Sequence, residues 1–457
     1  MTKTINIHFL GAAEVVTGSK YLVDTPEKNI LIDCGMFQGS KELRELNWLE
    51  LPIDVSAIDI VMLTHGHLDH VGFLPRLLYQ GFKGVIIGTA PTLAITEIVL
   101  MDSGKIHEEE ASKANKENYS KHKPALPFYT IKDVKKTIEY FQVINESVWV
   151  ELSNNISCRF KYNGHILGST FIELDIYGKR FVFSGDLGRS HDYLLSPPKK
   201  PKWADYLFLE STYGNKNHSH EDIESVLSNL IEETLMKKGN LIIPSFAVER
   251  LQTLIYLLWK LFKENKIPDI PIYIDSPMGN NVLEVFKDFP EWHNLTSSEY
   301  NAMRNHSNIV QSYKETWEVV DNPASKIIVA GSGMITGGRV LTYLQYLLNK
   351  PSTTVLLVGY QAEGTRGRKL LEGVDKLKIY GRYYPVLASV KNVESLSAHA
   401  DMNELLKWSN SIINAPEKVF LVHGEPEASF ELMKVMKQKF QWNIHLPKLF
   451  EVVQINI

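Results

Sequence analysis

Thr64-His65-Gly66-His67-Leu68-Asp69-His70 is the most informative segment of the sequence. It places four side chains that can bind a metal ion close together, and Gly66 allows the tight backbone path that such a loop needs. An apolar run over 58–63 precedes it, with the pattern of a strand buried on both faces, and an apolar helical stretch over 71–79 follows it. Imidazole and carboxylate groups are ligands that zinc and similar divalent ions prefer. The segment therefore predicts a metal site on a loop between a buried strand and a helix.

Three more candidate ligands, His165, Asp186 and His423, each stand next to or near a glycine at the end of a strand-like run. Because α/β folds place their chemistry at strand ends, we expect these residues to converge on the segment 64–70. Taken singly, each of them is as readily explained as a hydrogen-bonded turn residue. Asp33 ends a further strand-like run, and as a buried carboxylate it is expected to orient a ligand histidine.

The candidate ligands are enough for two metal ions. They divide into His65, His67 and His165 for one ion, Asp69, His70 and His423 for the other, and Asp186 as a bridge. Two ions roughly 3.5–4 Å apart are a standard arrangement for hydrolysing phosphate esters, with a bridging water that becomes hydroxide and attacks in line. Two Zn²⁺ ions per chain are expected, although Mn²⁺ also suits such a set of ligands.

The pattern of predicted helices and strands changes twice along the chain. Short strand-like runs with turns fill the first part, whereas after Asp205 strand-like runs alternate with amphipathic helices, as in a parallel α/β sheet. From about Pro385 the strand-rich texture returns. We therefore expect a strand-rich α/β domain over 1–207, a second α/β domain inserted over 208–388, and the completion of the first domain by 389–457.

Three local segments carry expectations of their own. Apolar residues at helical spacing predict a helix over 131–141. The polar segment 105–123 is expected to be either an exposed helix or a long loop. The proline- and lysine-rich segment Pro197–Lys202 is expected to be a linker or a boundary loop.

The overall composition excludes several classes of protein. The chain has 457 residues, of which 44% are hydrophobic and 22% charged, as in ordinary globular proteins and unlike disordered or coiled-coil chains. No apolar run approaches the ~18 residues of a membrane helix, and the first residues lack the apolar core of a signal peptide. Cys34 and Cys158 cannot build a disulfide framework. We therefore expect a cytoplasmic protein without membrane contact, and the net charge of −4 restricts any nucleic-acid binding to a local basic groove.

The order of the candidate ligands resembles that of the metallo-β-lactamase superfamily of dinuclear zinc hydrolases. His-x-His-x-Asp-His is followed by His165, Asp186 and His423, and Asp33 matches the first motif of that superfamily. The resemblance implies the metallo-β-lactamase αββα sandwich, an α/β fold, with His65, His67, Asp69, His70, His165, Asp186 and His423 as metal ligands.

The inserted domain is similar to that of the β-CASP subfamily of nucleases, which adds three motifs. Glu210 in Leu209-Glu210-Ser211-Thr212-Tyr213-Gly214 matches the first motif, and His399 in Ser397-Ala398-His399-Ala400-Asp401 matches the second. His423 in His423-Gly424-Glu425 matches the third. The resemblance covers essentially the whole chain and implies that the insertion is a β-CASP α/β domain, a parallel sheet flanked by helices. It extends to prokaryotic RNA-processing ribonucleases and to the cleavage subunit of eukaryotic pre-mRNA 3′-end processing.

What this resemblance implies is a zinc-dependent ribonuclease of RNA processing or decay. Such an enzyme hydrolyses phosphodiester bonds of single-stranded RNA by a dinuclear metal-bound hydroxide and leaves 5′-phosphate and 3′-hydroxyl ends. A histidine in the third motif, here His423, favours RNA over DNA. The implied catalytic residues are Asp69, Glu210 and His399. His399 would contact the scissile phosphate and protonate the leaving oxygen, which imidazole suits near pH 7, and Glu210 would orient His399.

Two loops of the inserted domain are candidates for RNA contact. Gly331-Ser332-Gly333-Met334 lies between a strand and a helix, where backbone N–H groups can face phosphate, although a plain tight turn explains it as well. The basic segment 361–369 offers Arg366, Arg368 and Lys369, unless it is only a solvated helix start. The candidate RNA-binding residues are Ser332, Gly333, Arg366 and Arg368. The expected partners are single-stranded RNA and, in a homodimer, a second copy of the chain.

Three other functions compete with this one. A DNA nuclease of the same subfamily is the nearest. A metallo-hydrolase of small thioesters, lactams or phosphodiesters explains the ligands but leaves the inserted domain, Glu210 and His399 without a role. A non-catalytic binding subunit is the third, but such members usually lose metal ligands and none is missing from this sequence.

Overall fold

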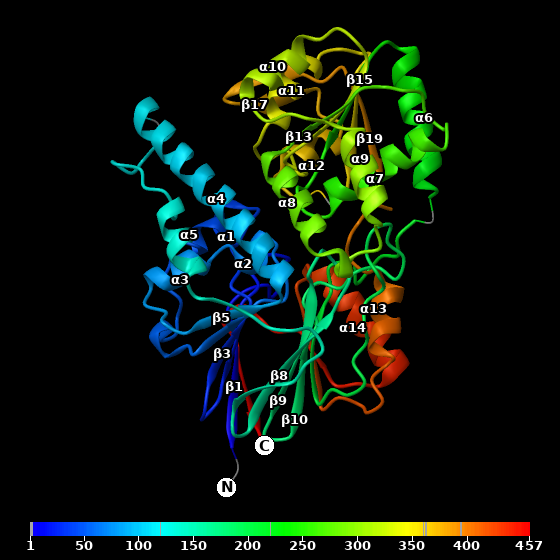
Figure 1. Ribbon diagram of the computed structural model, residues 1–457. Helices are drawn as coiled ribbons and strands as arrows, with labels where there is room; N and C mark the ends of the chain where they lie inside the picture. Colours follow the sequence, from blue (N-terminus) through cyan, green and yellow to red (C-terminus); the bar gives the residue numbers. More distant parts are fainter. Residues whose placement is uncertain (1–2, 119, 220, 360, 362, 394) are drawn as a thin grey trace. The chain divides into compact units, whose positions relative to one another are not determined.

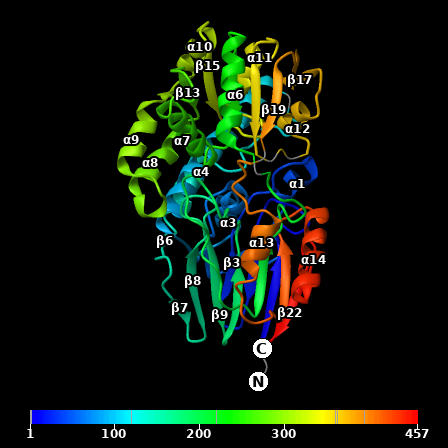
Figure 2. The same cartoon turned by 90° about the vertical axis from the view of Figure 1, so that its right-hand side faces the viewer.

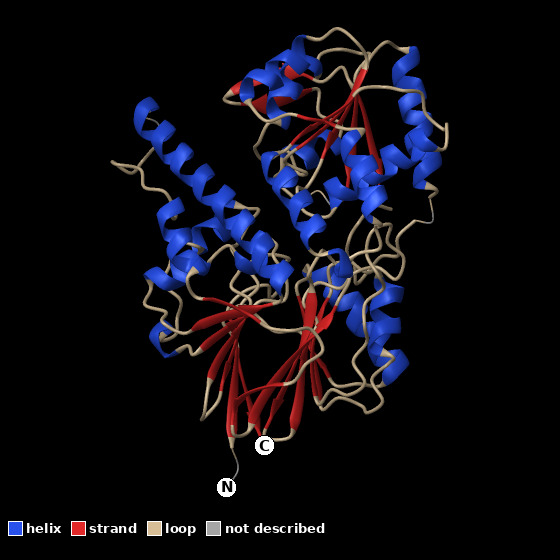
Figure 3. Ribbon diagram, viewed as in Figure 1, coloured by secondary structure: helices blue, strands red, loops and turns tan. Residues whose placement is uncertain are grey.

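The computed structural model describes residues 3–118, 120–219, 221–359, 361, 363–393 and 395–457. The chain divides into two compact units, Met1–Asn217 with His399–Ile457 as the first unit and His218–Ala398 as the inserted unit. Both are mixed α/β structures, as the sequence predicts (Figures 1 and 3). Among the described residues, no helix is both long and apolar enough to cross a membrane.

Two seven-stranded sheets form the centre of the described part of the first unit (Figure 3). One sheet has the order β22 (Val452–Asn456), β1 (Thr4–Phe9), β2 (Tyr21–Asp24), β3 (Asn29–Ile32), β4 (Ile60–Met62), β5 (Val85–Gly88) and β6 (Phe141–Val143). The other has the order β21 (Ile444–His445), β20 (Lys418–Val422), β11 (Tyr206–Glu210), β10 (Lys179–Phe183), β9 (Thr170–Ile176), β8 (Ile156–Tyr162) and β7 (Val150–Ser153). Strands from both ends of the sequence therefore pair within each sheet.

The core of the first unit lies between its two sheets. Residues of β1 and β8 alternate between buried and partly exposed, which is the pattern of strands with one face on a core. Phe9 of the first sheet packs against Phe208 of the second, with ring centroids 6.0 Å apart, and Phe208 stacks on Phe183 at 4.1 Å. Burial of each such ring contributes roughly 1.5–3 kcal/mol, so this shared layer holds the two sheets together.

Helices cover the outer faces of the sandwich. On the side of the first sheet lie α1 (Lys41–Leu46), η1 (Val55–Ala57), α2 (Leu68–Val71), α3 (Leu74–Tyr79), α4 (Ala90–Glu117) and α5 (Ile131–Ile138) (Figure 1). On the second sheet lie α13 (Met402–Ser409) and α14 (Pro426–Phe440) (Figure 2). Leu207 and Leu209 of β11 share a buried cluster with Leu405 of α13 and Leu432 of α14. The first unit is therefore the predicted αββα sandwich.

The structure settles the local expectations of the first unit. The polar segment 105–123 is helical as far as Glu117, where α4 ends at Asn118 in the left-handed region, and Tyr119 lies outside the described residues. The predicted helix over 131–141 is too long, because α5 ends at Ile138 and Phe141 pairs with Ile86 in the sheet. Pro197–Lys202 contains no helix or strand, as expected, but it lies inside the first unit and not at its boundary.

The inserted unit is built on a parallel sheet. The order of its six described strands is β14 (Asn308–Ile309), β13 (Ile272–Asp275), β15 (Lys326–Ala330), β12 (Asn240–Pro244), β16 (Thr354–Val358) and β19 (Ser389–Val393), and all neighbours are parallel. A hairpin of β17 (Lys376–Ile379) and β18 (Arg382–Pro385) stands apart from this sheet. The helices are α6 (Ile223–Met236), α7 (Arg250–Lys263), α8 (Pro277–Asp288), η2 (Pro290–Trp292), α9 (Ser297–Asn305), α10 (Tyr313–Asp321), α11 (Val340–Leu347) and α12 (Arg366–Leu371).

Candidate metal centre

The candidate ligands lie at strand ends of both sheets of the first unit. His65 and His67 follow β4, and α2 carries Asp69 and His70 directly afterwards. The other three follow strands of the second sheet: His165 comes after β8, Asp186 after β10 and His423 after β20. The fold brings all seven together, as strand-end placement predicts.

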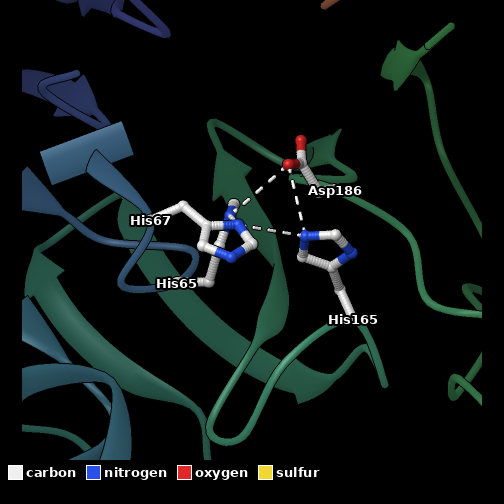
Figure 4. A group of neighbouring side chains, drawn as sticks. All are labelled: His65, His67, His165 and Asp186. Atoms are coloured by element: carbon white, nitrogen blue, oxygen red, sulfur yellow. Dashed lines mark hydrogen bonds and ion pairs between the residues drawn. The ribbon is translucent and has the colours of Figure 1, made fainter. Parts of the chain in front are cut away.

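Four of these side chains form the first ligand group, namely His65, His67, His165 and Asp186 (Figure 4). One ligand atom from each lies within 4.8 Å of those of the others. His67 Nδ1 lies 3.1 Å from His65 Nε2 and 3.2 Å from His165 Nε2. The Oδ2 atom of Asp186 lies 3.4 Å from His65 Nε2 and 3.5 Å from His165 Nε2. The four groups therefore point at one small common space.

Asp69, His70 and His423 form the second ligand group, again with ligand atoms within 4.8 Å of one another. His423 Nε2 lies 3.2 Å from His70 Nε2 and 3.3 Å from Asp69 Oδ2. The Oδ1 atom of Asp186 lies 3.2 Å from His70 Nε2 and 3.5 Å from His423 Nδ1. Asp186 thus presents one carboxylate oxygen to each group, which is the geometry expected of a bridging ligand.

The electrostatics of the first ligand group favour a bound cation. Burial lowers the pKa of His65 to about 3 and that of His67 to about 4, so both imidazoles are neutral near pH 7. Although burial alone would raise it, the pKa of Asp186 is held well below its usual range by His423 and His70. The ring nitrogens of His65, His67 and His165 face one another at 3.1–3.2 Å, so their lone pairs can be directed at one common cation. This set of nitrogen and carboxylate donors fits a divalent metal ion such as zinc.

Asp33 contacts His70 of the second ligand group, and Thr64 is hydrogen-bonded to Asp33. The Oδ2 atom of Asp33 lies 2.7 Å from His70 Nδ1, and the carboxylate accepts hydrogen bonds from the N–H and hydroxyl of Thr64, both at 2.8 Å. Asp33 adopts a φ of 57°, in the left-handed region that non-glycine residues seldom occupy. Burial lowers the pKa of His70, but Asp186 and then Asp33 outweigh it and raise that pKa well above its usual value. Asp33 therefore lies against His70, one of the candidate ligands.

Two supporting residues were missed by sequence reasoning. Thr64 is one of them: it begins the histidine segment, and its position directly before His65 could have indicated a supporting role. Thr212 lies two residues after Glu210, and its hydroxyl is 3.1 Å from His423 Nδ1 and donates to the His423 carbonyl at 3.0 Å. His423 itself has a φ of 50° and donates its N–H to Ala12 O at 2.7 Å. Such strain is typical of functional sites whose surroundings hold the backbone in place.

Glu210 and His399 form a pair beside the bridging aspartate. His399 Nδ1 lies 3.3 Å from both carboxylate oxygens of Glu210, and His399 Nε2 lies 3.9 Å from Asp186 Oδ2. Glu210 is fully buried and accepts the N–H of Leu187 at 2.6 Å. Burial acts to lower the pKa of His399, but Glu210 and Asp186 outweigh it and raise that pKa to about 9. The imidazole of His399 is therefore protonated near pH 7 and lies next to the ligand groups.

The four candidate RNA-binding residues lie together within the inserted unit. Gly367 N donates to Met334 O at 3.1 Å, which joins the segment of Arg366 and Arg368 to that of Ser332 and Gly333. The guanidinium of Arg366 donates to backbone carbonyls of the glycine-rich segment, and Arg368 forms an exposed ion pair with Glu372 at 2.8 Å. Ala362, in the same basic segment, lies outside the described residues.

Comparison with family models agrees with this architecture. Residues 14–238 match the metallo-beta-lactamase superfamily, residues 251–370 match the Beta-Casp domain, and residues 383–447 match the Zn-dependent metallo-hydrolase RNA specificity domain. The three matches follow one another along the chain and overlap both units.

Curated relatives match along nearly the whole chain. Ribonuclease TTHA0252 of Thermus thermophilus is 34% identical over 94% of this chain and 96% of its own. An RNase J-like protein of Methanocaldococcus jannaschii is 31% identical over 92% of each chain. Transcription termination factor FttA of the same organism is 29% identical over 99% of this chain and 72% of its own.

Among solved structures, a protein of unknown function from Enterococcus faecalis is similar in fold. It covers 99% of this chain and is itself covered completely, with a TM-score of 0.55 and 13% identity. With the ligand groups, the αββα sandwich and the inserted parallel sheet in place, the chain belongs to the metallo-β-lactamase superfamily and, within it, to the β-CASP family.

Proposed function

We propose that this protein is a ribonuclease that uses two metal ions to hydrolyse phosphodiester bonds of single-stranded RNA. Zinc is the metal that we expect. The observation that carries the proposal is the position of Asp186, whose two carboxylate oxygens face two separate ligand groups. Two adjacent ions are a standard arrangement for phosphate-ester hydrolysis. The ribonuclease named among the relatives and the RNA specificity domain support RNA as the substrate.

The ions, when bound, would supply an activated water and neutralise charge on the phosphate. His65, His67 and His165 would hold one ion, Asp69, His70 and His423 the other, and Asp186 both. Asp33 keeps the His70 ring in place through its contact with His70 Nδ1, and Thr64 donates its hydroxyl to Asp33. Such supporting contacts usually matter for metal affinity by about 10–100-fold.

His399 would protonate the leaving oxygen. Its Nδ1 faces Glu210, so the proton available for donation is on Nε2, the ring nitrogen nearer to Asp186. The raised pKa, about 9, keeps this proton in place at neutral pH. Glu210 is itself fixed by the N–H of Leu187, and Ala400 N donates to Leu187 O at 2.7 Å, so the pair is held by the backbone on both sides. Protonation of the departing 3′ oxygen would leave a 3′-hydroxyl, and water attack would place the phosphate on the 5′ end.

The test is cleavage of single-stranded RNAs labelled at either end, with and without chelator, and with the metal content of the same sample measured. We expect chelator-sensitive cleavage, a 5′-phosphate on the downstream product and close to two metal ions per chain. The Asp186→Asn protein should bind less metal and lose cleavage. Equal cleavage by the Asp186→Asn protein would contradict the proposal, and faster cleavage of the matching DNA would assign the enzyme to DNA instead.

A further inference from the structure

The inserted unit exposes a row of aromatic side chains on α10 and α11 that the metal centre does not use. Tyr313 and Trp317 stand four residues apart on α10 and so share a face, with 52% and 38% of each residue exposed. Arg339 and Tyr346 stand seven residues apart at the start and end of α11, again on one face, and Tyr346 is 48% exposed. Large exposed aromatic groups in contact with one another mark interaction surfaces more often than isolated ones do.

These four residues make two contacts between the two helices, and we call the four together the aromatic ladder. The guanidinium carbon of Arg339 lies 5.2 Å from the ring centroid of Tyr313. The rings of Trp317 and Tyr346 meet edge to face, with centroids 5.0 Å apart and planes at 81°. Each of the three aromatic side chains is therefore partly exposed while it contacts a partner on the other helix.

A buried carboxylate holds the ladder rigid. Asp275 is fully buried and accepts hydrogen bonds from Arg339 at 2.8 Å, from Thr316 at 2.7 Å and from Tyr343 at 2.7 Å. Thr316 belongs to α10 and Tyr343 to α11, so the same carboxylate ties both helices together. A preformed aromatic surface loses little conformational entropy when a ligand binds to it.

The neighbouring hairpin extends the surface and adds positive charge. Tyr380 and Tyr383 are 50% and 66% exposed, and Lys378 Nζ lies 5.8 Å from the Tyr383 ring. Gln345 of α11 donates to the hydroxyl of Tyr384 in the hairpin at 3.0 Å, which places the hairpin beside α11. Lys376 and Arg382 of the same hairpin are exposed as well.

Arg366 links this surface to the glycine-rich segment. Its guanidinium donates to Lys378 O at 2.8 Å, to Ile335 O at 3.2 Å and to Thr336 O at 3.0 Å. Carbonyl oxygens carry no formal charge, so these bonds orient the guanidinium without neutralising it.

Two of the nearby acidic groups are paired with basic side chains, and a third, Glu315, is hydrogen-bonded but keeps its charge. Asp275 is paired with Arg339. On α10, Glu315 accepts the N–H of Gln311 at 2.9 Å and the hydroxyl of Ser312 at 2.8 Å, and Glu318 pairs with Lys314 at 3.8 Å. The surface therefore combines exposed aromatic side chains with the basic side chains of Arg366, Lys376, Lys378 and Arg382. That combination is typical of single-stranded nucleic-acid binding, in which bases stack on aromatic rings and cations follow the backbone.

We propose that the aromatic ladder is a stacking surface for unpaired bases of the RNA, with Arg366 at its edge as a contact for the phosphate backbone. This inference rests on the proposed function and adds a binding surface to it. Because the ladder lies outside the metal centre, it should act on the affinity for RNA and not on the chemical step. It should also be sequence-tolerant, since every base has a stacking face.

The test compares two exposed tryptophans in the full-length, metal-loaded protein. Trp317→Leu removes the ladder ring, and Trp48→Leu is the matched control, because Trp48 is 53% exposed and meets Phe128 edge to face at 5.1 Å. The substrates are a single-stranded oligoribonucleotide and bis(p-nitrophenyl) phosphate, which has no bases to stack. We expect Trp317→Leu to raise the KM for RNA roughly 5- to 150-fold with kcat unchanged, as loss of one stacked base implies. Hydrolysis of the small diester should stay the same, and Trp317→Phe should restore most of the affinity.

An unchanged KM for RNA in the Trp317→Leu protein, with its thermal midpoint intact, would overturn the inference. So would an equal effect of Trp48→Leu. If Trp317→Leu alters the oligomeric state in sedimentation while leaving the KM for RNA unchanged, the ladder is an interface between copies of the chain and not an RNA surface. If the wild-type protein cleaves the small diester but not RNA, the proposed function fails. Direct titration of both variants with labelled RNA then still decides the role of the ladder.

Discussion

Neutralising Glu210 is expected to shift the pH dependence of RNA cleavage. Burial lowers the pKa of His399, but three carboxylates, of which Glu210 is the first and Asp186 and Asp69 follow, raise it from 6.5 to about 9. One pKa unit corresponds to about 1.4 kcal/mol, so the protonated imidazole is favoured by about 3 kcal/mol. Glu210→Gln keeps an oxygen for the N–H of Leu187 but removes the charge. Loss of the largest carboxylate contribution should lower the pKa of His399 by roughly one unit or more.

The sign of the effect follows from the role of His399 as an acid. Cleavage needs the protonated ring, so activity is present below the pKa of His399 and is lost as the pH rises through it. A lower pKa therefore moves this loss to lower pH. For a shift of one unit, the Glu210→Gln protein should be about tenfold slower than the wild type above both pKa values and about threefold slower midway between them, and well below both values the rates should converge. Bound metal ions lower the pKa of His399 in both proteins, so the difference between them remains.

The assay is the initial rate of RNA cleavage across the pH range, repeated with bis(p-nitrophenyl) phosphate. Its leaving group departs without a proton, so Glu210→Gln should cost much less on this substrate. Glu404→Gln is the control variant, because Glu404 is a nearby carboxylate that accepts the N–H of Ser190 at 2.7 Å and caps α13. The assignment of His399 as the acid is refuted if both variants share the wild-type pH profile. It is refuted as well if Glu210→Gln slows both substrates equally.

Three further predictions concern the metal centre and the core. Chelation should lower the thermal midpoint as well as abolish cleavage, because a ligand bound only by the folded state stabilises it; calorimetry with zinc added back checks this. In Gly35→Ala the new Cβ would lie 1.6 Å from the carbonyl oxygen of Asp69, so the ligand loop must move, and metal titration should show affinity reduced by more than tenfold. Phe208→Ala removes a ring stacked at 4.1 Å on Phe183 between the two sheets, and denaturant unfolding should show a loss of about 3–5 kcal/mol.

Much of the metal centre was predictable because its residues follow a simple rule. Each candidate ligand is a histidine or aspartate just after an apolar strand, and the ends of neighbouring strands meet at the edges of sheets. Helices with a regular apolar face were predictable for a similar reason. The end of α5 was not predictable. Phe141 fits the helical pattern, but it pairs with Ile86 of a strand that is distant in the sequence. Helix propensity over a short segment does not include this competition between helix formation and strand pairing.

The residues that support the ligands depended on contacts far apart in the chain. Thr212 reaches His423 across 211 positions, and Asp33 reaches His70 across 37. The ladder is similar, because the pairing of Tyr313 with Arg339 and of Trp317 with Tyr346 requires α10 and α11 to lie side by side. In a helix pattern, each of these aromatic residues is indistinguishable from an ordinary core position.

The sequence alone predicted the kinds of candidate ligand, their order along the chain and the presence of an inserted α/β domain, because these depend on residue type and on local periodicity. It could not assign one oxygen of Asp186 to each ligand group, nor place the protonated His399 beside that bridge. Those features arise only when two sheets pack face to face and bring strand ends of both to one edge. Burial in that shared core then sets the pKa values, lowering those of His65 and His67 while Glu210 and Asp186 raise that of His399.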